Sequence, residues 1–195
     1  MPEALDLSRP AEFVERLPAM DRESPVDLVI ANAGAGARPG VSPWSWEAVE
    51  EAFHTNVCGA AATLTALTDA MVARGRGHLV AIGSISALGP LPAEEAYCAP
   101  KAGLRMLAAC LALDLVPRGV HVTIVNLGFV RTAMVAGSTH PLPGLMEPED
   151  AALAVLRAVN EKRREVDVPR WLGGLARAAG VLPDSLRGGW MRPWE

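Results

Sequence analysis

The chain has 195 residues, of which 50% are hydrophobic and 21% charged, a balance typical of a globular protein and not of a disordered one. Its formal net charge of −4 argues against broad electrostatic binding to nucleic acid or to anionic lipid. Three cysteines without the spacing of a zinc site indicate a reduced, cytoplasmic protein with neither a disulfide framework nor a metal centre.

The first half of the chain alternates helix and strand patterns. Its N-terminal segment "MPEALDLSRP" has no apolar core of the kind that a signal peptide needs. The elements predicted here are a helix over 9–20, a strand over 26–34, a long helix over 45–75 and a strand over 77–86. Ser8 is the expected N-cap of the first helix, and Gly75 ends the second.

The second half continues the alternation. The elements predicted here are a helix over 96–116, a strand over 119–128, a helix over 147–162, a strand over 164–171 and then a short helix with an irregular tail. Arg105 and Asp114 interrupt the most apolar of these helices, so we expect no membrane span. Strands that alternate with helices indicate an α/β fold with a parallel sheet. Because the strands are apolar without clean alternation, we expect helices on both faces.

The end of the first strand, "ANAGAGARPG", has the small residues of a glycine-rich phosphate loop but not its spacing. Gly34 and Gly36 begin a G-x-G-x-x-G pattern, and Pro39 stands where the third glycine is needed. Ligands of parallel sheets bind beyond the carboxyl ends of the strands. We therefore expect one shared crevice lined by the three strand ends that finish in small or polar residues, which are Asn32-Ala33-Gly34, Gly83-Ser84 and Asn126-Leu127-Gly128.

The stretch "GSISALGPLPAEEAYCAPK" carries the strongest chemical signal. Tyr97, the only tyrosine of the chain, lies four residues before Lys101, so the two share one face of a helix. A neighbouring ammonium favours the phenolate, so we expect Lys101 to lower the pKa of Tyr97 and to fit it for proton transfer. Ser84 ends the preceding strand, where its hydroxyl can polarise a substrate oxygen. In the alternative interpretation, Tyr97 is a half-buried packing residue and Lys101 is solvated.

This pattern resembles the short-chain dehydrogenase/reductases, whose signature is Tyr-x-x-x-Lys with a serine thirteen residues before the tyrosine. "ANAGAG" is similar to the family's Asn-Asn-Ala-Gly motif, and "NLGFVRT" is similar to its Asn-Pro-Gly-x-x-x-Thr motif, with Leu127 in place of the proline. Asn56 matches the family's helix asparagine, although it could also be a satisfied polar group within a helix. Pro100 stands where the family more often has serine or threonine, and a helix accepts proline easily only in its first turn.

The resemblance implies a Rossmann-like fold and hydride transfer between NAD or NADP and an alcohol or carbonyl compound. It implies the catalytic residues Asn56, Ser84, Tyr97 and Lys101. It implies the cofactor-binding residues Asp6, Asn32, Ala33, Gly34, Tyr97, Lys101, Gly128, Val130 and Thr132, the last of which could instead be a helix cap. The expected substrate pocket is apolar, which suggests a hydrophobic alcohol or ketone, and consists of Ala87, Leu88, Pro90, Phe129 and Met134.

Compared with the family, the sequence starts at a position that matches the end of the third strand. The family opens with a strand, a Thr-Gly-x-x-x-Gly-x-Gly turn, a helix and a second strand, whereas "EALDLS" matches the end of the third strand. Two strand–helix units, on the order of 60 residues, are absent. We therefore expect a single domain over 1–195 that lacks its N-terminal βαβα portion and keeps about four strands, with "VDLVIA" as an apolar sheet edge open to another chain.

Two functional hypotheses follow. In the first, the chain is an NAD(P)-dependent oxidoreductase, and its start reflects a fragment or a misplaced start codon. In the second, it is a non-catalytic interaction or signalling module derived from the family. Without the helix N-terminus that binds the pyrophosphate, we expect residues 1–195 alone to bind NAD(H) and NADP(H) weakly or not at all. The helices around 60–71 and 104–115 are apolar nearly all round, so we expect a homodimer or larger homo-oligomer.

Overall fold

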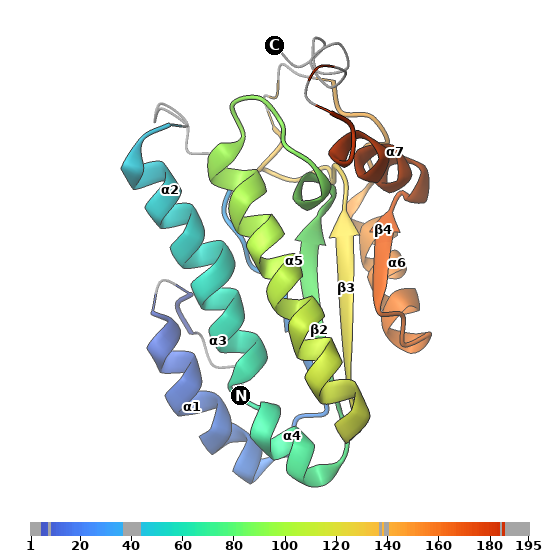
Figure 1. Ribbon diagram of the computed structural model, residues 1–195. Coiled ribbons are helices and arrows are strands. Elements are labelled where there is room, and N and C mark those ends of the chain that lie inside the picture. Colours follow the sequence, from blue (N-terminus) through green and yellow to red (C-terminus); the bar gives the residue numbers. More distant parts are fainter. Residues whose placement is uncertain are drawn as a thin grey trace.

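A computed structural model describes residues 5–7, 9–36, 44–136, 138, 141–183 and 185. Within these residues four strands form one parallel sheet in the order β1-β2-β3-β4 (Figure 1). The strands are β1 (Leu28–Ala31), β2 (Gly77–Ser84), β3 (Val120–Leu127) and β4 (Glu165–Val168). The α-helices are α1 (Pro10–Glu23), α2 (Trp46–Phe53), α3 (Ala60–Thr65), α4 (Thr68–Arg74), α5 (Glu95–Leu115), α6 (Pro148–Asn160) and α7 (Arg170–Gly180). The shorter turns are the π-helix η1 (His54–Gly59) and the 3₁₀ helices η2 (Ile85–Leu88) and η3 (Val116–Arg118).

The sheet confirms the Rossmann-like α/β prediction, and helices lie on both of its faces. On one face α3 and α5 pack over the sheet, and the core there includes Leu64, Leu79 and Leu104, all nearly inaccessible to solvent. On the other face α6 packs over β3 and β4, where Val125 and Ala158 belong to a second, smaller cluster. Burial of both faces explains why the strands are apolar without clean alternation.

The strand β1 lies at one edge of the sheet. Val29 and Ala31 are buried in the larger core, whereas Leu28 and Ile30 are 42% and 40% exposed on the opposite face. Among the described residues β1 pairs only with β2, so its other backbone edge has no strand partner there. This matches the expected apolar edge.

The long helix predicted over 45–75 is interrupted. It begins as α2 behind the cap Ser45, whose side chain accepts a hydrogen bond from Ala48 N, and it ends at Gly75 with a φ of 65°. Between these ends the π-helix η1 replaces α-helical pairing. By length and composition Trp46–Arg74 is the one helix of the described residues that could cross a membrane, and 39% of its apolar window is buried. Within it α2 packs on α5, and α3 packs on β1.

The first helix is longer than predicted and begins one residue later. Arg9 occupies its N-cap position without a side-chain cap, and the expected cap, Ser8, lies outside the described residues. Near its other end the buried Asp21 accepts hydrogen bonds from Val26 N at 2.8 Å and from Arg74 Nη1 at 2.5 Å. These contacts fasten α1 to α4 beside the main core.

Candidate active site

The carboxyl ends of the strands bring Ser84, Tyr97 and Lys101 together. Ser84 is the last residue of β2 and also caps the short helix η2. Tyr97 and Lys101 lie one turn apart in α5, which packs against both η2 and β2. The helix runs through the buried Pro100 without a break, so this departure from the family pattern does not displace Lys101.

The hydroxyl of Ser84 interacts with the phenol of Tyr97 and lowers the pKa of Tyr97. Burial has the larger effect, however, and the pKa of Tyr97 lies above its ordinary value of 10.0. The prediction that Lys101 lowers this pKa is therefore wrong for the structure as it stands. The reason is that burial of the half-buried phenol opposes its ionisation more than its surroundings favour it.

Lys101 is 5% exposed, and its Nζ donates to the carbonyl oxygen of Ile82 at 3.3 Å. Nζ also lies 5.8 Å from the centre of the Tyr97 ring. Burial disfavours the charged amine and lowers the pKa of Lys101 from 10.5 to about 8. Lys101 is therefore a buried amine that faces the strand ends and is not the solvated surface lysine of the alternative interpretation.

Asn56 is fully buried at the centre of the π-helix η1. Its Nδ2 donates to Ala35 O at 2.9 Å, and its Oδ1 accepts from Ala35 N at 3.1 Å. The amide thus fixes the loop after β1. A Cβ added to Gly34 would lie 2.7 Å from Asn56 Oδ1 and 3.2 Å from Lys101 Nζ. The loop therefore approaches both side chains as closely as only glycine allows.

The predicted cofactor residues lie around this centre. Asn32, Ala33 and Gly34 are exposed just beyond the end of β1. The exposed Asp6 precedes Leu7, which contacts Gly59 of η1. Beyond β3 lie the half-buried Gly128 and Val130 and the exposed Thr132, whose Oγ1 donates to Val130 O at 3.3 Å.

The predicted substrate-pocket residues fall into two groups. Ala87 and Leu88 belong to η2, which packs against α7, and the exposed Pro90 follows directly. Phe129 and Met134 belong to the segment after β3, and Met134 lies against Gly36 beyond β1. Met134 therefore lies near the end of β1, whereas Ala87 and Leu88 lie near α7.

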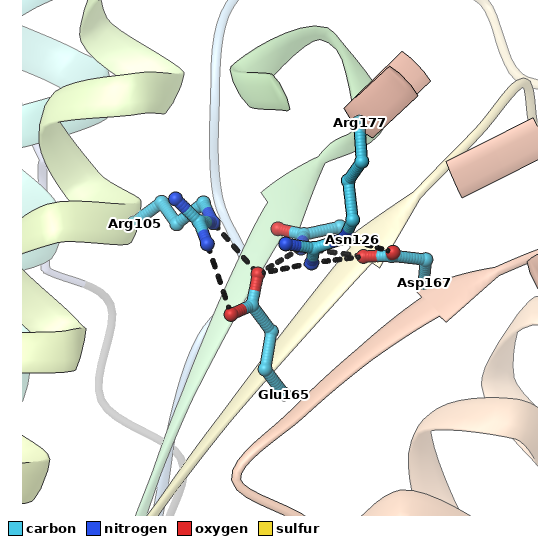
Figure 2. Close-up of polar contacts among 5 residues, drawn as sticks. All are labelled: Arg105, Asn126, Glu165, Asp167 and Arg177. Atoms are coloured by element: carbon cyan, nitrogen blue, oxygen red, sulfur yellow. Dashed lines mark hydrogen bonds and ion pairs between the residues drawn. The ribbon is translucent and has the colours of Figure 1, made fainter. Parts of the chain in front are cut away.

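One predicted crevice residue has a different role. Asn126 is fully buried, and its Nδ2 donates to Glu165 Oε1 and to Asp167 Oδ1, each at 2.8 Å (Figure 2). Its Oδ1, which faces Gly83, has no hydrogen-bond partner among the described residues. The side chain of Asn126 is thus bound by the carboxylates of β4. The site is bordered by the residues that follow β3 and not by this amide.

Two arginines complete this network, which we call the β4 charge network and which consists of Arg105, Asn126, Glu165, Asp167 and Arg177 (Figure 2). Arg105 of α5 donates to both oxygens of Glu165, at 2.6 and 3.1 Å. Arg177 of α7 donates to Glu165 Oε1 at 2.6 Å and to both oxygens of Asp167. Burial opposes ionisation of Glu165, but the hydrogen bonds from Arg105, Arg177 and Asn126 outweigh it and lower its pKa to about 2.

Sequence reasoning did not find the β4 charge network. It joins α5, β3, β4 and α7, and α7 in turn packs on η2 next to Ser84. Beside it a groove of about 820 Å³ lies between α6, β4 and α7, and none of the predicted site residues lines it. Among the described residues no group of three or more histidine, cysteine or acidic side chains is placed to hold a metal ion.

Comparisons with known proteins agree on one family. A family model described as short chain dehydrogenase matches residues 4–143. An uncharacterized oxidoreductase of Myxococcus xanthus is 39% identical over 186 residues, which cover 95% of this chain and 74% of that protein. The ketoacyl reductase HetN of Nostoc is 32% identical over 154 residues, which cover 77% of this chain. The match spans about half of the length of HetN, 54%.

Solved structures show the same fold. A short-chain dehydrogenase from Sphingobium yanoikuyae in complex with NADPH superposes with a TM-score of 0.76 at 25% identity, covering 96% of this chain and 73% of its own. A short chain dehydrogenase from Burkholderia cenocepacia in complex with NADP has a TM-score of 0.80, with coverages of 97% and 77%. Its identity of 23% makes it a likeness of fold.

Proposed function

The chain belongs to the short-chain dehydrogenase family, and from this premise we propose that Ser84, Tyr97 and Lys101 carry an NAD(P)-dependent interconversion of an alcohol and a carbonyl compound. The observation that carries the proposal is the buried Lys101, whose Nζ lies 5.8 Å from the centre of the Tyr97 ring, beside Ser84 at the end of β2. The alternative of a non-catalytic module is not favoured, because burying a lysine is costly and a packing role does not require it.

The polar groups have separate tasks in the proposed reaction. The nicotinamide cofactor would supply the hydride for the carbonyl carbon, or accept it in the reverse direction. The Tyr97 phenol donates its proton to the carbonyl oxygen during reduction, and its raised pKa keeps that proton in place at neutral pH. The Ser84 hydroxyl donates a hydrogen bond to the same oxygen and stabilises the charge that develops there.

The described residues fit a nicotinamide cofactor at the end of β1. Gly34 is exposed and lies close to the side chains of Asn56 and Lys101, so the loop backbone there borders both polar groups. In the proposal Lys101 Nζ donates to the nicotinamide ribose, and the residues after β1 and β3 lie beside the cofactor; these are Asp6, Asn32, Ala33, Gly34, Gly128, Val130 and Thr132. Asn56 holds Ala35 in place and can support a water in the proton relay.

We also propose a small apolar alcohol or ketone as the substrate and a cytoplasmic homo-oligomer as the working form. The apolar side chains of Ala87, Leu88, Phe129 and Met134 support the first point. The second is supported by a stripe on α5 formed by Met106, Cys110 and Leu113, which are exposed to solvent although two of them are large and apolar. Exposed apolar stripes of this kind are typical of subunit interfaces.

The test is turnover of small apolar ketones with NADH and NADPH by a form of the protein that binds the dinucleotide, with and without the substitution Tyr97→Phe. We expect a loss of roughly 10²–10⁴-fold in kcat, because the proton donor is removed while the ring remains. Calorimetry should give the same dissociation constant for the dinucleotide with and without the substitution Tyr97→Phe. Near-normal turnover by Tyr97→Phe would contradict the proposed role. A low-micromolar dissociation constant for residues 1–195 alone would contradict the weak binding expected from the sequence.

A further inference from the structure

Ser86 contacts Ser84 twice. It lies two residues further along the chain in the 3₁₀ helix η2, and its backbone N–H donates to Ser84 Oγ at 3.2 Å. Its hydroxyl donates to the same oxygen at 2.8 Å. Ser84 is buried and Ser86 half-buried, so water competes little with either contact.

These two contacts determine what Ser84 can still do. A serine hydroxyl has one proton to donate and two lone pairs that accept. Because both bonds from Ser86 end on Ser84 Oγ, they use its two acceptor positions and leave the proton. The remaining proton is available to the oxygen of Tyr97, whose pKa Ser84 lowers, or to the oxygen of a bound substrate.

Ser86 also interacts with a residue of α5. Its hydroxyl interacts with the thiol of Cys98, which follows Tyr97 in α5, and this interaction lowers the pKa of that thiol. Burial raises the pKa of Cys98 to about 11, so the thiol keeps its proton at neutral pH. Of the interactions among these side chains, the two from Ser86 to Ser84 have the geometry of hydrogen bonds.

We propose that Ser86 is a positioning residue that occupies the acceptor positions of Ser84 Oγ and so leaves the hydroxyl proton of Ser84 for the oxygen of Tyr97 or of a bound substrate. The inference rests on the proposed function for its meaning in catalysis. The two hydrogen bonds from Ser86 to Ser84 do not depend on that function, and their effect on the pKa of Tyr97 can be measured without turnover. With Ser86 absent, the Ser84 hydroxyl is free to rotate and to point its proton elsewhere.

The experiment uses Tyr97 as its own reporter, because the chain contains one tyrosine. Tyrosine labelled with ¹³C at Cζ gives a single resonance whose pH titration yields the pKa of Tyr97. The variants are Ser84→Ala, Ser86→Ala and Ser86→Thr, and Ser24→Ala at the exposed end of α1 is the matched control. Cys98→Ala and Cys98→Ser provide a second pair if Ser86→Ala does not fold.

Ser84→Ala should raise the pKa of Tyr97 by roughly 0.5 or more, because it removes the interaction that favours the phenolate. Ser86→Ala should raise it by a large part of that amount, whereas Ser86→Thr, which keeps the hydroxyl, and Ser24→Ala should leave it unchanged. Cys98→Ala should have a smaller effect in the same direction, and Cys98→Ser little effect. In turnover, Ser86→Ala should lower kcat about tenfold with KM unchanged, and Ser86→Thr should restore it.

The outcomes separate this inference from the proposed function. A raised pKa in Ser84→Ala with no change in Ser86→Ala or Cys98→Ala would overturn the positioning role and leave the Ser84–Tyr97 pair intact. No change in Ser84→Ala would remove the interaction of Ser84 with Tyr97 from the proposed function, and the inference with it. Equal effects of Ser86→Ala and Ser86→Thr would mean that packing and not the hydroxyl is responsible, and would also overturn the inference.

Discussion

Arg177 donates two hydrogen bonds to Asp167, from Nε at 2.7 Å and from Nη2 at 2.9 Å, and thereby joins α7 to the edge strand β4. Arg177→Met removes both bonds and the bond to Glu165. Because Arg177 is 41% exposed, we expect a loss of only about 1–2 kcal/mol in the free energy of unfolding. Urea denaturation measures it, with Arg157→Met in the same groove as the control. Equal effects of the two variants would contradict the importance of the β4 charge network.

The stability of the protein should depend on Glu165 in acid. The pKa of Glu165 is about 2 in the folded state against an ordinary value of 4.5, so the folded state favours the carboxylate. Its contribution to stability is fully present above 4.5 and is lost as the pH falls from there toward 2. The difference in unfolding free energy between wild type and Glu165→Gln should shrink over this window. A constant difference would show that the carboxylate has no favoured charge state.

Lys101 should make the stability of the protein rise with pH in alkali as well. Its folded-state pKa of about 8 lies below its ordinary 10.5, so between these values the unfolded chain binds a proton that the folded chain lacks. The stability of wild type relative to Lys101→Met should therefore rise as the pH increases from 8 to 10.5. Comparison of the two proteins cancels the titration of Tyr97 and Cys98, which both variants keep. A flat difference in unfolding free energy would mean that the amine is well solvated.

Gly34 should not tolerate a methyl group. In Gly34→Ala the new Cβ would lie 2.7 Å from Asn56 Oδ1, so the loop or the amide must move and the bonds to Ala35 weaken. We expect a lower melting temperature and, in a form of the protein that binds the dinucleotide, weaker binding. Gly174→Ala is the control, because a Cβ there meets no atom within 4 Å and alanine favours a helix. If both variants bind and melt alike, the loop has more room than the structure indicates.

The stripe on α5 should mediate self-association. Leu113 is 66% exposed, and a charge there would be buried in any interface that this face forms. Leu113→Lys should therefore shift the protein toward a monomer in light scattering, whereas Leu153→Lys, at the 51% exposed Leu153 of α6, should not. Since the exposed Cys110 lies between Met106 and Leu113, mild oxidation should cross-link two chains through it. A wild-type monomer at micromolar concentration would rule out this interface.

The parts of the site that depend on local spacing could be predicted from the sequence. Tyr97 and Lys101 share a helix face because they are four residues apart, and Ser84 borders them because it ends a strand of a parallel sheet. The pKa of Tyr97 was predicted in the wrong direction, because sequence reveals a charged neighbour but not the depth of burial. The same limitation hid the role of Ser86, since a contact across two residues of a 3₁₀ turn leaves no periodic pattern.

The parts that depend on long-range register could not be predicted. Asn126 pairs with Asp167 across β3 and β4, so their side chains meet only once this strand register is known. Asn126 belongs to a family motif at a strand end, and for this reason the sequence predicted that it lines the crevice. The β4 carboxylates bind it because burying an amide without partners is costly, and they supply acceptors for its Nδ2. Arg177 reaches the same carboxylates from a helix whose direction the sequence does not give.

The π-helix η1 has a consequence for the helices on either side of it. A π-turn takes in one more residue than an α-turn, and one residue corresponds to about 100° of rotation around an α-helix. The apolar side of α3 is therefore out of phase with that of α2 along the same rod. This offset lets α2 pack against α5 while α3 packs against β1 and α1. Deleting one residue from η1 would bring the two halves back into phase, so that one of them would turn its apolar side to water and Asn56 would no longer face Ala35.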